Sequence, residues 1–231
     1  MSSAFRPVIG LVGQVCAGKS TVAEAFQRRG AWVYDADKIV AELYKDRGVV
    51  QQVQKMFGRE VVNIDGTVNK KALAQIAFTD PAELKRLTQE IIFPRTGAAL
   101  ESILKKFREE SDAPALILDA PTLFEAGRAD VCDRILFVSA PVERRQEWSL
   151  KRGWDVNERE RREKRLGDEN AKLEKADAVI VNDGSIEHIE REVEDILKEW
   201  SAEAPARRAP LPGSKQGQEH PRNAGATPEI K

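Results

Sequence analysis

The sequence is poor in the residues that build several common kinds of functional site. It holds two cysteines, Cys16 and Cys132, and two histidines, His188 and His220. Two thiols do not form a disulfide framework, and the first residues contain no apolar stretch typical of a signal peptide, so we expect a cytoplasmic protein. Two histidines far apart in the sequence argue against a histidine-ligated metal and against a serine–histidine hydrolase.

The sequence also lacks an excess of charge and a long apolar run. Lysine and arginine number 37 against 38 aspartates and glutamates, a formal net charge of −1. A nearly neutral chain has no broad attraction to nucleic acid or to anionic membranes, so we expect neither as a partner. No run approaches the roughly 20 apolar residues that a membrane-spanning helix needs.

What the sequence does contain is a complete phosphate-binding motif near its start. It reads Gly13-Gln14-Val15-Cys16-Ala17-Gly18-Lys19-Ser20-Thr21. An apolar strand pattern precedes it and a helical pattern follows, which is the context of a P-loop. Backbone amides and the helix N-terminus of such a loop bind phosphate oxygens. We therefore expect all nine residues to bind a nucleotide, with Lys19 at the terminal phosphates and Ser20 as a magnesium ligand.

Five short apolar runs predict a parallel α/β sheet flanked by helices. They are residues 8–12, 31–34, 115–118, 135–138 and 178–182. Ligands of such sheets bind at the carboxyl ends of the strands. Asp35 and Asp37 follow the second run, and we expect one to cap a helix and the other to act in chemistry. Asp119 follows the third run and is expected near the magnesium water shell, a cap of the next turn being the alternative.

Composition divides the chain further. Residues 1–38 and 111–200 form the predicted core. Residues 39–110 have helical periodicity, are too long for an ordinary crossover and predict a substrate-binding insertion, with a purely structural helical cover as the alternative. Within it, Pro94 is expected to kink or end a helix.

The charged segment at about 144–172 predicts a lid, or else a solvated helix face. Residues 201–231 are expected to be a disordered tail.

Taken together, these motifs resemble the dephospho-coenzyme A kinase family over roughly residues 8–200. The resemblance rests on the P-loop, on Asp35-Ala36-Asp37, on residues 119–125 (DAPTLFE), and on Lys172 with residues 176–182 (ADAVIVN). It implies a P-loop kinase fold with a helical substrate-binding insertion and a helical lid. It also implies an enzyme that phosphorylates the ribose 3′-hydroxyl of dephospho-coenzyme A with ATP and Mg²⁺, giving coenzyme A and ADP.

The resemblance also implies roles for single residues. Asp37 matches the general base or acceptor-orienting group, with Asp35 in reserve, and Arg144 and Arg152 fall where the family's lid begins. Asn182 joins the ATP-binding set, and Asp119 the metal set through water. The implied substrate contacts are Asp37, Phe93, Pro94, Arg95, Leu123 and Glu125. The sequence departs from the family pattern at Gln14 and Cys16, which replace glycines, and at Phe93, where the family usually has histidine.

Two alternatives remain open on sequence alone. One is a nucleoside or nucleotide kinase of the same fold, and the other is a catalytically weak relative that binds ATP. The expected partners are small molecules, which under the leading interpretation are ATP and dephospho-coenzyme A, and we expect a monomer or a weak homo-oligomer.

Overall fold

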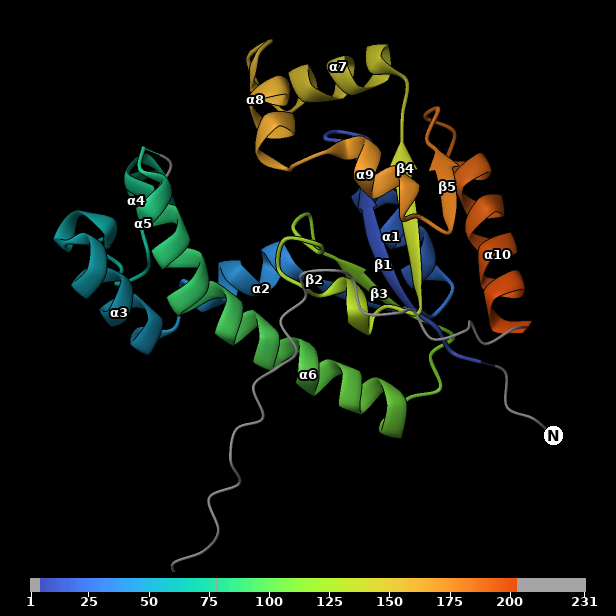
Figure 1. Cartoon of the computed structure of the whole chain (residues 1–231), viewed down its shortest axis with the longest axis horizontal. Coiled ribbons are helices and arrows are strands. Elements are labelled where there is room, and N and C mark those ends of the chain that lie inside the picture. Colours follow the sequence, from blue (N-terminus) through green and yellow to red (C-terminus); the bar gives the residue numbers. More distant parts are fainter. Residues whose placement is uncertain (1–4, 78, 203–231) are drawn as a thin grey trace, which may run out of the picture.

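A five-stranded parallel sheet lies at the centre of the computed structural model, which describes residues 5–77 and 79–202 (Figure 1). The strands are β1 (Val8–Gly13), β2 (Trp32–Asp35), β3 (Leu116–Asp119), β4 (Arg134–Ser139) and β5 (Ala178–Val181). Their order is β2-β3-β1-β4-β5 and each pairing is parallel. The predicted α/β fold class is confirmed, and the loop after the central strand β1 opens between its two neighbours, where such sheets bind ligands.

Apolar helix faces cover both sides of this sheet. On one side, α1 (Lys19–Arg28) and α10 (Ile186–Ala202) bury Phe26 and Val193 against Ile9. On the other, α6 (Phe93–Glu110) buries Phe107 beside Phe137. Each large apolar side chain removed from water in this way contributes about 1.5–3 kcal/mol to folding, which fixes the sheet as a rigid base for its loops.

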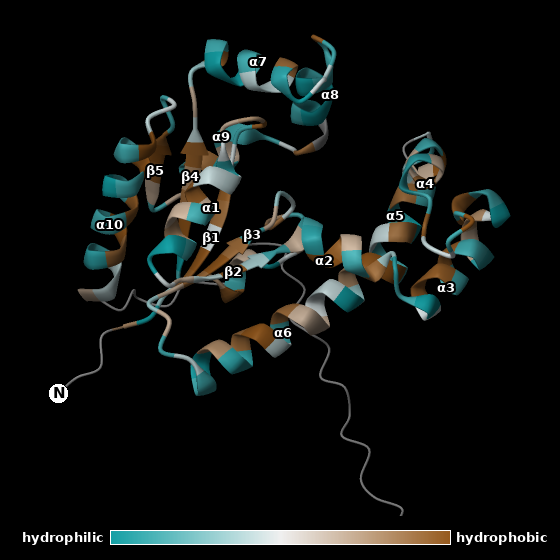
Figure 2. Ribbon diagram, turned by 180° about the vertical axis from the view of Figure 1, so that it is seen from behind, coloured by the Kyte–Doolittle hydropathy of each residue, from teal (hydrophilic) through white to brown (hydrophobic). Residues whose placement is uncertain are grey.

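Helices α2 to α5 follow β2 before the chain returns through α6. Their bounds are α2 (Ala36–Leu43), α3 (Arg47–Phe57), α4 (Lys70–Ala77) and α5 (Pro81–Arg86). A hydrophobic cluster of their own, which includes Val53, Phe57, Leu73 and Ile91, joins α3 to α5. Figures 1 and 2 show these three helices beside the sheet rather than on one of its faces. The segment is helical as expected, and its separate cluster allows it to present a surface toward the strand ends.

The chain does not leave the helix at Pro94. A π-helical segment, Leu87–Ile92, runs directly into α6, with Pro94 in the first turn of α6. Proline is tolerated there because the first-turn N–H groups are not needed for the helix, and the wider π turn keeps the chain continuous. The Arg95 and Thr96 side chains donate to the carbonyls of Ile91 and Ile92, at 3.1 and 2.8 Å. Of the two outcomes expected at Pro94, a kink or an end of the helix, the end is therefore wrong, because the chain remains helical through this residue.

Three helices after β4 rise over the P-loop end of the sheet (Figure 1). They are α7 (Val142–Lys151), α8 (Glu158–Arg165) and α9 (Glu169–Glu174). Short 3₁₀ turns occupy Arg59–Val61 and Ala129–Val131. Within the described ranges, no helix has the length and apolarity required to cross a bilayer. The predicted disordered tail was to begin at residue 201, but Ser201 and Ala202 still belong to α10 (Ile186–Ala202), and the rest of the predicted tail, from position 203 onward, lies outside the described residues.

Candidate active site

The loop after β1 has the backbone conformation of a phosphate cradle. Gly13 and Gly18 have φ angles of 145° and 84°, and a Cβ on Gly13 would collide with the carbonyl oxygen of Val138. Both positions therefore require glycine. Cys16, where the resembled family has glycine, has φ 60°, which is the one left-handed non-glycine conformation in the described residues. The substitution noted in the sequence thus falls at a strained position, and the loop nevertheless keeps its shape.

Asn182 braces this loop from the end of β5. Its side chain is buried, at 3% exposed, and its amide nitrogen donates to the Ala17 carbonyl at 2.9 Å. Its side-chain oxygen accepts from the Gly184 backbone at 3.0 Å. The residue implied for ATP binding therefore holds the loop that would bind the phosphates, and its direct contact with nucleotide remains a prediction.

The Lys19 side chain folds back over the P-loop that precedes it. Its ammonium donates to the carbonyls of Gly13 and Gln14, at 3.2 and 2.9 Å. Burial lowers the pKa of Lys19, while the neighbouring Asp119 carboxylate acts to raise it. A partly buried cation whose hydrogen bonds all go to carbonyl groups is poorly compensated, so incoming phosphate oxygens would improve its surroundings.

Three carboxylates gather at the adjacent strand ends. Asp35 and Asp119 are register partners on β2 and β3, and Asp37 lies in the first turn of α2. Asp35 caps α2, because its side chain accepts from the Lys38 backbone at 2.9 Å and pairs with the Lys38 ammonium at 3.1 Å. The expectation that one aspartate of this pair caps a helix is confirmed for Asp35. Asp37 makes no capping hydrogen bond at that helix start and is the more exposed member of the pair.

The pKa values of two of these carboxylates are displaced upward. Burial raises the pKa of Asp119 to about 6, against the lowering effect of Lys19 and with the help of Asp35 and Asp37. Partial burial and the Asp35 carboxylate also raise the pKa of Asp37. Like charges held close together are unfavourable, and Lys19 and Lys38 offset this only in part, so this edge of the sheet is suited to a divalent cation or to proton transfer.

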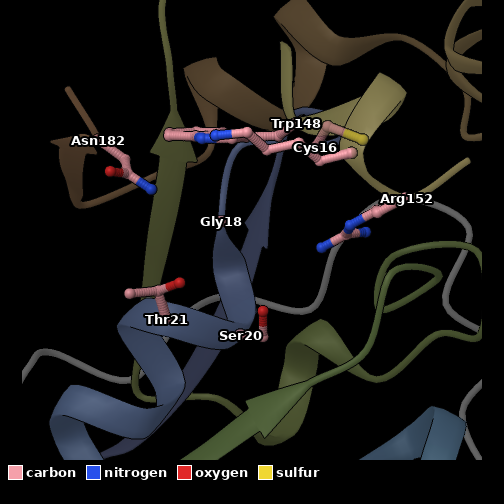
Figure 3. Close-up of a pocket in the computed structure, with 8 residues that line it drawn as sticks. Cys16, Gly18, Ser20, Thr21, Trp148, Arg152 and Asn182 are labelled. Atoms are coloured by element: carbon pink, nitrogen blue, oxygen red, sulfur yellow. The ribbon is translucent and has the colours of Figure 1, made fainter. Parts of the chain in front are cut away.

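A cavity of about 270 Å³ opens between the P-loop and the helices above it (Figure 3). Its lining comes from the P-loop, from α1, from the end of α7 and from β5: Cys16, Gly18, Ser20, Thr21, Trp148, Lys151, Arg152 and Asn182. Figure 3 shows the Arg152 guanidinium directed into this space. The structure thus brings together the predicted P-loop residues, Arg152 and Asn182, and it adds Trp148 and Lys151, which carried no motif in the sequence.

Further arginines of α8 extend the positive charge over the loop. The charges of Arg152, Lys19, Arg159 and Arg162 all act to lower the pKa of the Cys16 thiol, although burial outweighs them and raises it. The Arg162 guanidinium lies 4.1 Å from the ring centroid of Trp154 and that of Arg152 lies 5.8 Å from it. Arg159 and Arg162 were missed as single residues, because nothing but their position in a basic run distinguished them.

Arg144 lies differently from Arg152. It is exposed, pairs with Glu147 on α7 at 3.2 Å, and does not line the cavity. Arg145, its neighbour, is turned inward and shares the Glu163 carboxylate with Arg159, at 2.7 and 2.6 Å. Basic and acidic residues alternate in this segment, so the sequence did not predict that Arg145 rather than Arg144 lies on the inner side of α7.

The predicted substrate contacts on α6 lie at the junction of the insertion with the sheet. Arg95 donates to Gln52 of α3 at 2.7 Å. Arg128, from the loop after β3, donates to the Phe93 carbonyl at 3.1 Å and to Thr96 Oγ1 at 2.6 Å. Pro94 is exposed. These contacts fix the start of α6, and the roles of Phe93, Pro94 and Arg95 toward a substrate remain predictions.

The loop after β3 contains two further predicted substrate contacts, Leu123 and Glu125. Leu123 is 1% exposed and packs in the core, against Gly10. Its side chain is closed to a ligand, so the predicted contact between Leu123 and substrate is not supported. Glu125 is exposed in part, and its carboxylate pairs with the Lys172 ammonium of α9 at 2.8 Å.

A P-loop with its lysine, carboxylates at the neighbouring strand ends and an arginine-bearing helical lid define a class of protein, the P-loop kinases. Comparison with known proteins narrows the class. A family model described as dephospho-CoA kinase matches residues 7–188. The chain belongs to the dephospho-CoA kinase family, as the sequence motifs predicted.

Individual relatives agree with this assignment. The chain is 37% identical to the dephospho-CoA kinase of Aquifex aeolicus (strain VF5) over 192 residues, which are 83% of this chain and 96% of that protein. It is 34% identical over 195 residues to the dephospho-CoA kinase of Rhodopirellula baltica (strain DSM 10527 / NCIMB 13988 / SH1), covering 83% and 89% of the two chains. The crystal structure of TT1252 from Thermus thermophilus matches with a TM-score of 0.71 at 30% identity, covering 84% of this chain and 98% of that one.

Proposed function

We propose that this protein transfers the γ-phosphoryl group of ATP to the ribose 3′-hydroxyl of dephospho-coenzyme A, giving coenzyme A and ADP. The observation that carries the proposal is the position of Asp37 and Asp119 beside Lys19 at one edge of the sheet. A donor loop and an acceptor-side carboxylate there serve a single in-line transfer.

In the proposed reaction the P-loop and Lys19 bind the phosphates, and Arg152 reaches them from the lid. The acceptor hydroxyl oxygen forms a bond to the γ-phosphorus as the bond to the ADP oxygen breaks. Asp37 accepts the hydroxyl proton, and its pKa, raised by partial burial and by the Asp35 carboxylate, makes it a stronger base than an ordinary aspartate. Water is excluded by the lid, which limits loss of the phosphoryl group to hydrolysis.

The residues present fit a magnesium ion. Mg²⁺ binds few protein ligands directly and takes the rest of its shell from water and nucleotide phosphates. Asp35, Asp37 and Asp119 lie at neighbouring strand ends, but among the described residues no three acidic, histidine or cysteine side chains are arranged to hold a metal ion by themselves. Ser20, and Asp119 through water, would hold the ion, which when bound neutralises phosphate charge and relieves the poorly compensated Asp119.

The helical insertion, residues 39–110, is the proposed wall for the acceptor. It continues from α2, which carries Asp37, and returns through α6 beneath the loop that contains Arg128. A long acceptor such as dephospho-coenzyme A needs more contact surface than a nucleoside does. The separate hydrophobic cluster of α3 to α5 supports this use, because it packs these helices against one another rather than against the sheet.

One assay tests the proposal and its competitors. The protein is incubated with ATP, Mg²⁺ and either dephospho-coenzyme A or a panel of nucleosides and nucleotides, and ADP release is followed. We expect turnover with dephospho-coenzyme A. Turnover only with nucleosides or nucleotides would replace the proposed acceptor, and ATP binding without turnover on any acceptor would identify a binding protein.

A further inference from the structure

Helix α9 contains a buried lysine for which the phosphoryl-transfer chemistry supplies no role. Lys172 is 8% exposed and is the only charged residue among the buried ones, considering the side chains that the structure describes. Burying an ammonium is costly unless it is paired, so a lysine in this position indicates a specific partner. Apolar residues would pack such a position at lower cost.

The partners of Lys172 all lie in the loop after β3, which begins at Asp119. Its ammonium pairs with the Glu125 carboxylate at 2.8 Å and lies 3.5 Å from the Pro121 carbonyl oxygen. Directly after the last residue of α9, the Lys175 ammonium lies 5.1 Å from the ring centroid of Phe124. One lysine of this short helix and one at its C-terminal end therefore contact the loop that continues from the predicted metal-binding carboxylate.

The same helix touches the donor side of the site. The Gln14 side-chain amide in the P-loop donates to the Glu169 carboxylate at 2.5 Å, and the Gln14 side-chain oxygen accepts from the Ala140 backbone at 3.0 Å. Gln14 replaces a glycine of the family pattern, so this chain has a side-chain link between P-loop and α9 that a glycine does not provide.

The lid is joined to this arrangement by covalent continuity. Helix α8 ends at Arg165 and α9 begins at Glu169, with Gly167 between them at φ 73°. A Cβ on Gly167 would lie 3.3 Å from Glu125 Oε1, so the return of the lid passes directly over the Lys172–Glu125 pair. Helix α9 is thus in contact with donor loop, acceptor-side loop and lid.

We propose that Lys172 is a positioning residue of the transfer site, which through Glu125 and the Pro121 carbonyl holds the loop after Asp119 in register with the P-loop and the lid. This inference rests on the proposed function for its kinetic consequences, whereas the contacts themselves do not. The charge of Lys172 also reaches the P-loop, since it acts to lower the pKa of Lys19. Glu125, predicted as a substrate contact, is in this account the counter-ion of Lys172.

The test compares Lys172→Met, Lys172→Arg, Glu125→Gln and the double variant Lys172→Met/Glu125→Gln. Lys198→Met is the matched control, because it also removes a lysine paired with glutamate, at 2.6 Å, but on α10. We expect Lys172→Met to lower kcat about 10- to 100-fold, since a small displacement of reacting groups has effects of that size. The dissociation constant for ADP should change less than about threefold, and Lys172→Arg should recover most of the rate.

The double variant separates a positioning pair from two independent contacts. If Glu125 acts through Lys172, the double variant is no slower than Lys172→Met alone, because the two changes break one interaction. Multiplied losses would instead indicate that Glu125 contacts substrate by itself and would overturn the pairing. A kcat within about twofold of wild type for Lys172→Met, with only its melting temperature lowered, would show a purely structural ion pair and would overturn the inference.

Hydrogen exchange decides the inference independently of turnover. In Lys172→Met, and in Glu125→Gln if the first variant does not fold, peptides covering 120–126 and 166–175 should lose protection together, while those covering α10 should not. Unchanged protection in both segments would refute the positioning role. A wild-type protein without activity on dephospho-coenzyme A would count against the proposed function, and the exchange result would still hold or fail by itself.

Discussion

Replacing Asp119 with asparagine should make the ligand-free protein more stable, although it damages the site. The carboxylate is largely buried at the end of β3, and burial raises its pKa from 3.8 to about 6. A carboxyl whose pKa is higher in the folded state binds its proton more tightly there. The contribution of this bound proton to the free energy of unfolding is therefore fully present below pH 3.8 and is lost as the pH rises through about 6.

The magnitude follows from the shift. A difference of about 2 pKa units means that Asp119 lowers the free energy of unfolding, relative to its value at low pH, by ~3 kcal/mol above pH 7. At pH 5, where the folded carboxyl is still mostly protonated, it lowers the free energy of unfolding by ~1.6 kcal/mol. Asp119→Asn removes the charge and keeps the shape. The substitution should raise the free energy of unfolding by up to these amounts. The difference in unfolding free energy between the variant and wild type should therefore roughly double between pH 5 and pH 8.

Urea unfolding of wild type and Asp119→Asn at pH 5 and pH 8, with equal m-values, measures this difference. Asp112→Asn, which removes an exposed carboxylate shortly before the same strand, is the control. Added Mg²⁺ and ATP should reverse the order, because wild type gains the binding free energy that the variant loses. A gain equal at both pH values, or a loss of stability at pH 8, would refute the reasoning.

Three further predictions concern single side chains. Asp37→Asn should lower kcat by roughly a hundredfold with little change in ADP affinity, and should remove the acid limb of the wild-type pH–rate profile, which lies above the ordinary aspartate pKa; an unchanged profile would exclude Asp37 as the base. Lys19→Ala should weaken both nucleotide binding, measured by calorimetry, and turnover, and an unaffected rate would remove the P-loop assignment. Asn182→Ala should lower the free energy of unfolding by about 1–3 kcal/mol in a urea titration, because the Ala17 carbonyl and the Gly184 N–H lose their buried partner. A decrease below ~0.5 kcal/mol would show that Asn182 does not stabilise the P-loop.

The strands, the P-loop and the family were predictable because each is encoded locally. Buried β-branched runs give the strands, and the P-loop glycines are required by the backbone, as the collision of a Gly13 side chain with Val138 shows. A helix cap from the Asp35 and Asp37 pair was predictable for the same reason, since the bond from Asp35 to Lys38 spans only three residues, although the sequence did not indicate which of the two aspartates forms it.

Features that depend on distant contacts were not predictable. The continuation of the helix through Pro94 needs a π turn and side-chain bonds to the freed carbonyls. The burial of Leu123 depends on Gly10, more than a hundred positions away. The inward face of the lid depends on which arginine meets Glu163, and Arg145 and Arg159 do so where Arg144 does not. Charge alternation in the sequence carries no information about that choice.

The position of the transferred phosphate tests the central claim most directly. After incubation with ATP, Mg²⁺ and dephospho-coenzyme A, the product is isolated and its new phosphomonoester is located by ³¹P–¹H correlation NMR. The account predicts one added phosphate, coupled to the ribose H3′ proton, formed in equal amount to ADP. Phosphate on any other hydroxyl, or ADP formed with free phosphate and unchanged acceptor, would contradict it.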